Sequence, residues 1–189
     1  CSHDGKETCV ATDKRYEIQE LRLYNGKVFA NIVEETAAKY LFKLLVIEPD
    51  GSEVQELVTY LETEKAGRVP VQSESFQIHR NKAILPVEIK GTGGEAEYGL
   101  AIVDLNTRVV TYPDIEPLSV NNPKTGDIKG YGDCLFYCRP VGKRMLLYRY
   151  RITDGQTDTH EMLPSFGGVY GLLDENRVLY LMCKENGKR

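Results

Sequence analysis

The chain has 189 residues, of which 41% are hydrophobic and 28% charged, with a formal net charge of −4. This length and apolar content suffice for the core of one domain. The charges are spread without the basic block that proteins use against a phosphate backbone, and no apolar run approaches the ~20 residues that a membrane-spanning helix needs. Nucleic acid is therefore not an expected partner.

The amino end is polar and then changes character. Residues 1–15 lack hydrophobic periodicity, which predicts a flexible tether ahead of a single β domain over residues 16–189. Cys1 followed by Ser2 resembles the start of a mature bacterial lipoprotein, whose first thiol carries diacylglycerol. The resemblance implies lipidation of Cys1 and an extracytoplasmic protein, either membrane-anchored or secreted. The alternative is that Cys1 marks only a boundary within a longer chain.

Two segments have the pattern of antiparallel hairpins. Asn25 and Gly26 separate two strand-like runs, and this dipeptide favours a two-residue hairpin turn. Residues 82–115 contain two apolar runs and a third, β-branched run, separated by turn-forming residues. This second segment predicts an antiparallel meander.

The stretch between these segments fits two structures. Residues 54–61 place apolar side chains at the spacing of one helix face, and Ser52 with Gln55 fits a capping box. The same residues fit a strand that follows a turn at residues 49–51 and pairs back on residues 40–48. We predict the strand, because strands and turns alternate through the rest of the chain.

Strand-like runs recur along the sequence. They begin near Lys27, Lys82, Cys134 and Arg177, each after a short turn. Repeats of roughly 40 to 50 residues with about four strands are typical of β-propeller blades. On these runs, which cover Tyr16 to Cys183, the chain resembles a β-propeller, although it contains no tryptophan and so lacks the Trp-Asp signature of WD repeats.

The resemblance implies an all-β fold, a partial β-propeller of about three and a half antiparallel blades. Propellers close with roughly four to eight blades, so this number would leave strand edges and apolar faces uncovered. A β-sandwich or a barrel of about ten short strands is the alternative, because neither leaves such an opening.

Five cysteines raise the question of disulfides. Cys134 and Cys138 would lie roughly 13 Å apart along an extended strand, too far to bridge one another. We predict that Cys134 or Cys138 pairs with Cys183. If Cys1 is lipidated, an even number of cysteines remains for bridges, while buried free thiols are the alternative.

No catalytic or cofactor motif emerges from the sequence. The segment from Gly91 to Ala96 has the spacing of a dinucleotide fingerprint, but a strand-like run follows it, which favours a plain hairpin loop. Asp154, Asp158, His160 and Glu161 crowd one segment and offer ligands for a divalent cation, but Asp158 and His160 on one face lack a third fixed ligand. We therefore predict no metal and no cofactor.

One basic stretch alternates with tyrosine. Guanidinium groups and aromatic rings on one surface can recognise a ligand, although a strand face solvated by arginine is the alternative interpretation. The candidate binding patch consists of Arg139, Arg144, Tyr148, Arg149 and Tyr150.

These patterns favour a non-enzymatic binding or assembly module that presents sheet edges and loops to a protein partner or to a second copy of itself. It would meet a membrane only through a lipid on Cys1. The hypothesis rests on the incomplete number of blades, since uncovered edges invite pairing with another chain. Two alternatives stay open, a propeller-type hydrolase or lactonase domain with a bound divalent cation, and a fragment of a larger propeller scaffold.

Overall fold

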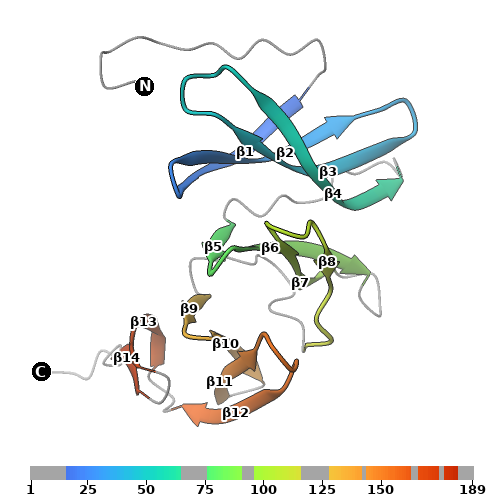
Figure 1. Ribbon diagram of the computed structural model, residues 1–189. Coiled ribbons are helices and arrows are strands. Elements are labelled where there is room, and N and C mark those ends of the chain that lie inside the picture. The colour runs from blue at the N-terminus through green and yellow to red at the C-terminus, as the bar shows by residue number, and fades with distance from the viewer. Residues whose placement is uncertain are drawn as a thin grey trace, which may run out of the picture. The chain divides into compact units, whose positions relative to one another are not determined.

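The computed structural model describes residues 16–64, 76–90, 96–115, 128–141, 144–162, 166–174 and 177–182. All regular structure in these ranges is β, and none of their segments forms a helix long and apolar enough to cross a membrane. The strands form three four-stranded antiparallel sheets and one two-stranded sheet (Figure 1). The predicted tether, with Cys1, lies outside the described residues.

The chain divides into two compact units. The first consists of Cys1–Glu88 and Leu100–Tyr112, and the second of Ile89–Gly99 and Pro113–Arg189.

The first sheet, here sheet 1, contains β1 (Tyr16–Tyr24), β2 (Lys27–Glu35), β3 (Lys39–Ile47) and β4 (Val54–Glu64) in chain order. Asn25 and Gly26 form the two-residue turn between β1 and β2, with φ angles of 49° and 75°. Two consecutive positive φ angles are those of a type I′ turn, which matches the twist of the flanking strands. The predicted hairpin is confirmed.

The ambiguous stretch is a strand, as predicted, and its bulges explain the helix-like spacing. Along β4 the pairing with β3 skips Tyr60 between Thr59 and Leu61, and it skips Leu57 between Glu56 and Val58. Each extra residue shifts the alternation by one position. Apolar side chains that contact one core therefore recur at helix-like intervals along a strand.

The second sheet, sheet 2, contains β5 (Gln77–His79), β6 (Lys82–Lys90), β7 (Ala96–Asp104) and β8 (Val110–Thr111) in chain order. The predicted meander of residues 82–115 corresponds to β6, β7 and β8, and β5 precedes it through a turn at Arg80 and Asn81.

One apolar cluster joins sheet 1 to the part of sheet 2 that belongs to the first unit. It contains aromatic and aliphatic side chains that are all buried, namely Phe29, Val33, Phe42, Leu44, Tyr60, Phe76, Ala83, Leu85, Val87, Ala101 and Val103. Inside it the Tyr60 hydroxyl donates a hydrogen bond to Asn31 Oδ1 at 2.7 Å. Burial raises the pKa of Tyr60, which keeps this hydroxyl protonated as a donor. Each fully buried large aliphatic or aromatic side chain stabilises the fold by about 1.5–3 kcal/mol.

The third sheet, sheet 3, lies in the second unit and contains β9 (Lys129–Tyr131), β10 (Cys134–Val141), β11 (Arg144–Arg151) and β12 (Thr157–Met162), ordered β12-β11-β10-β9. Cys134, Phe136 and Leu147 form an apolar cluster on one face. On the other face, the rings of Tyr137 and Tyr148 stack with centroids 5.0 Å apart.

The fourth sheet, sheet 4, pairs β13 (Phe166–Asp174) with β14 (Arg177–Met182).

The predicted repeat matches the sheets. Its four runs are β2, β6, β10 and β14, which begin at Lys27, Lys82, Cys134 and Arg177 and are each the second strand of a sheet. The described residues confirm the prediction of an all-β chain with repeated four-stranded antiparallel sheets. A radial arrangement of these sheets stays a prediction.

The turn after β7 is held by a carboxylate. Asp104 Oδ1 accepts hydrogen bonds from the backbone N–H groups of Asn106 and Thr107 at 3.0 and 2.9 Å, and Oδ2 accepts one from Lys82 Nζ at 3.0 Å. The Thr107 N–H and then the Lys82 ammonium lower the pKa of Asp104 to about 2.

Replacing Gly26 by alanine should destabilise the chain by about 1 kcal/mol. A Cβ there meets no atom within 4 Å, so the loss arises from the positive φ and not from a clash. Urea unfolding of both proteins measures the effect, and Gly26→Asn should lose less because asparagine tolerates a left-handed backbone better. Equal stability of Gly26→Ala and the parent would contradict the assigned turn.

The Asp104 carboxylate should make stability depend on pH. Its folded pKa is depressed, so its stabilisation is present above the unfolded pKa of about 4 and is lost as pH falls toward about 2. We expect Asp104→Asn to lose ~0.5 kcal/mol at neutral pH, a value reduced by solvent screening, and this difference should vanish near the folded pKa. Unfolding curves over this pH window provide the test, with the exposed Asp114→Asn as the control.

Candidate functional site

Strand β1 holds the segment around β5 with polar side chains. Glu20 accepts a hydrogen bond from the Phe76 backbone N–H at 2.5 Å, while Arg22 Nε donates to the Phe76 carbonyl at 3.0 Å. Glu20 and Arg22 also form an ion pair with each other. Two residues further, the Tyr24 hydroxyl accepts a hydrogen bond from the Asn81 N–H at 3.1 Å. One face of β1 therefore anchors both ends of the β5 segment within the first unit.

The opposite face of β1 presents aliphatic side chains to solvent. Ile18, Leu21 and Leu23 are 60%, 49% and 74% exposed, and we call these three residues the β1 stripe. Their register partners on β2 are Ile32, Ala30 and Val28. The irregularity between Ile18 and Glu20 brings Ile18 onto the same face as Leu21, because it inserts one extra residue, Gln19.

Among the described residues, sheet 4 has half as many strands as the other sheets. Strands β2, β6 and β10 each have a hydrogen-bonded neighbour on both sides. Within the described ranges, β14 has such a neighbour only on the side of β13. Strand β14 therefore resembles a central strand by its place in the repeat and an edge strand by its pairing.

The structure divides the predicted arginine and tyrosine patch. Tyr148 and Tyr150 are buried and pair with Tyr137 and Leu135, whereas Arg149 pairs with Phe136 on the opposite face of sheet 3. Arg144 is exposed at the start of β11. Arg139 pairs with Leu146 in β10, and its side chain is outside the described part. Arg149 is instead grouped by register with Arg151, because residues two apart share a face of a strand.

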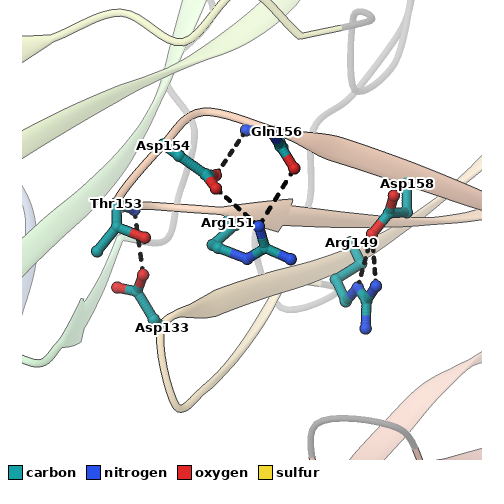
Figure 2. A network of polar contacts seen from close by, with 7 residues as sticks. All are labelled: Asp133, Arg149, Arg151, Thr153, Asp154, Gln156 and Asp158. Atoms are coloured by element: carbon teal, nitrogen blue, oxygen red, sulfur yellow. Dashed lines mark hydrogen bonds and ion pairs between the residues drawn. The ribbon is translucent and has the colours of Figure 1, made fainter.

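Arginine and acidic side chains form pairs along β11 and β12 (Figure 2). Arg149 Nε donates to Asp158 Oδ2 at 3.1 Å, and Arg151 lies 2.7 Å from Asp154 Oδ2. A third pair joins Arg144 to Glu161 at 3.3 Å. The hydrogen bond from Arg149 lowers the pKa of Asp158, and the Gln156 backbone N–H, followed by Arg151, lowers that of Asp154. Both carboxylates are thus held in their charged form.

The cation ligands considered from sequence are partly brought together. Asp158 and His160 share one face of β12, and their register partners on β11 are Arg149 and Leu147. The Asp158 carboxylate is already bonded to a guanidinium, which a divalent cation would have to displace. Among the residues with described placement, no group of three or more His, Cys, Asp and Glu residues is close enough to hold a metal ion.

The cysteine prediction is untested. Cys134 is buried and Cys138 is half-buried in β10, while Cys183 lies outside the described residues. The bridge from Cys134 or Cys138 to Cys183 stays a prediction.

In the glycine-rich segment, residues 91–95 lie outside the described residues, and the expected strand, β7, follows them.

No family model matches the chain, and no curated protein matches its sequence. The described residues offer three candidate surfaces, which are the β1 stripe, the edge of β14 and the ion pairs of sheet 3.

Arg149→Leu should raise the pKa of Asp158 toward its ordinary value, because the hydrogen bond from the guanidinium is the main cause of the shift. Carboxyl carbon NMR during a pH titration measures this change. Arg144→Leu is the matched control, because Arg144 pairs with Glu161 and should leave the titration of Asp158 unchanged. An unchanged titration midpoint of Asp158 in Arg149→Leu would show that Arg149 does not lower the pKa of this carboxyl.

Proposed function

We propose that this chain is a non-enzymatic assembly module that pairs the edge of β14 with an extended strand of a protein partner. The observation that carries the proposal is the unequal pairing of equivalent strands. Strands β2, β6 and β10 have neighbours on both sides, while β14 has one among the described residues. A strand added beside β14 would take the place that β3, β7 and β11 occupy in the other sheets.

The composition of β14 supports this function. Its sequence is Arg-Val-Leu-Tyr-Leu-Met, which contains strong β formers and neither proline nor an internal charge. Edge strands that avoid pairing usually carry such protective residues. An unprotected edge offers backbone N–H and C=O groups to a partner strand, as in recognition by β-augmentation.

A two-stranded sheet has little stability of its own, and sheet 4 is supported by contacts of β13 with β9 and β10. Isolated hairpins are marginal in water, and three or more strands or packing against another element are usually needed. A partner strand would add a further row of backbone hydrogen bonds to sheet 4. A partner strand that binds β14 would therefore also stabilise sheet 4.

The enzymatic alternative has less support. A hydrolase or lactonase would need a cation near Asp158 and His160, yet Arg149 already neutralises Asp158. The scaffold alternative is compatible with the same open edge, because further strands of a longer chain could occupy it. Lipidation of Cys1 would hold the assembly at a membrane surface and remains a separate prediction.

Hydrogen exchange tests the open edge in the monomeric chain. Amides of β2, which pairs with β1 and β3 along nearly its whole length, should exchange slowly throughout. Alternate amides of β14 that face away from β13 should exchange about tenfold faster or more, because they have no backbone acceptor among the described residues. Adding a synthetic peptide of residues 144–162, the hairpin that lies beside β10, should slow these β14 amides. The same peptide with Leu147→Pro is the control, because proline removes a donor and disturbs the strand. Slow exchange of all β14 amides in the free monomer would overturn the proposal.

A further inference from the structure

The β1 stripe is continuous with a buried apolar cluster on the same face of sheet 1. Ala30, Ile32 and Leu45 are buried there, with Tyr16, Ile47 and Val54 packed against them. Leu21 pairs with Ala30, and Ala30 in turn pairs with Leu45, so one row of apolar residues crosses three strands. The exposed stripe thus lies beside a buried apolar cluster on the same face and is not a set of scattered side chains.

The polarity of β1 is reversed from that of a solvated edge strand. Strands with one face in water place polar residues on that face and apolar residues on the covered one. In β1 the polar residues Glu20, Arg22 and Tyr24 bond to the segment around β5, while Ile18, Leu21 and Leu23 are exposed. This arrangement fits a strand whose outer face is covered by an apolar partner.

The same face carries an acidic border on the far strands. Lys43, whose side chain is 7% exposed, lies 2.6 Å from Glu34 and 2.8 Å from Glu56. Lys39 lies 3.0 Å from Glu62 and 3.7 Å from Glu64. Two glutamates share Lys39 at one end of this group, which gives that end an excess of negative charge, and Glu34 and Glu56 share Lys43 at the other end. We call these six residues the acidic border.

We propose that the outer face of sheet 1 binds a protein segment that presents apolar side chains flanked by lysine or arginine. The apolar side chains would cover the β1 stripe, and the basic ones would meet the acidic border. A second copy of the chain fits less well, because it would bring a second acidic border to the interface. An anionic lipid surface or a nucleic acid would be repelled by the same charge. The inference rests on the proposed role in protein binding but uses a surface separate from β14.

A binding measurement with short peptides tests the chemistry. The probe is a fluorescently labelled peptide of about eight residues with leucines in its centre and lysines at both ends, and the control probe carries glutamates in place of the lysines. Fluorescence anisotropy should show tighter binding of the lysine peptide, with affinity falling as salt increases. Glu62→Gln with Glu64→Gln should weaken this binding by about threefold to tenfold, because the acidic border loses two charges.

The apolar part of the surface is tested by Leu21→Thr with Leu23→Thr, which keeps strand-forming residues at exposed positions. We expect the affinity for the lysine peptide to fall about tenfold or more, because the apolar contact area is lost. Val109→Thr is the matched control, since Val109 is 57% exposed outside this face. Methyl NMR shifts of Ile18, Leu21 and Leu23 should locate the bound peptide on the stripe.

Three results would overturn the inference. The first is equal binding of the lysine and glutamate peptides, and the second is unchanged affinity in the Leu21→Thr, Leu23→Thr variant. The third is self-association of the parent chain that this variant abolishes, which would assign the face to a second copy. The β14 exchange experiment is independent of all three, so failure at either surface can be recognised separately.

Discussion

Backbone hydrogen bonding at strand edges is the constraint on which this structure depends. A strand has donors and acceptors on two edges, and both need a partner when water is excluded. In sheets 1, 2 and 3 the second strand in chain order has a hydrogen-bonded neighbour on each side. The same strands bury consecutive side chains, such as Ala83, Ile84 and Leu85 in β6. On β1, the side chains of Glu20 and Arg22 form hydrogen bonds with the backbone N–H and C=O of Phe76.

The packing of the first unit follows from strands that are apolar on both faces. In β2, Phe29 and Val33 contact the cluster shared with sheet 2, while Ala30 and Ile32 belong to the cluster on the opposite face. Such strands are typical of stacked sheets, because each sheet then covers one face of its neighbour. The β1 stripe belongs to the outer of these faces, so the same physical rule that forms the core also makes this surface suited to a partner.

The sequence predicted the features that depend on local conformation. The turn at Asn25 and Gly26 needs positive φ angles, which few dipeptides tolerate, and the strand repeat follows from alternation and turn residues. The division of Arg149 from Tyr148 could also have been found, because neighbours in a strand point to opposite faces. The bulges of β4 and the reversed polarity of β1 could not, since both depend on contacts with strands and turns distant in sequence.

Two carboxylates of the second unit, Asp154 and Asp158, are paired with arginine. General acid–base chemistry at neutral pH usually needs a carboxyl whose pKa is raised by burial or by a like charge. Asp154 and Asp158 are exposed, and their pKa values are lowered by Arg151, Arg149 and a backbone N–H. These carboxylates stay ionised and bonded to arginine. Among the described residues, the edge of β14 and the exposed aliphatic side chains of the β1 stripe are the groups on which the proposed binding of a protein strand depends.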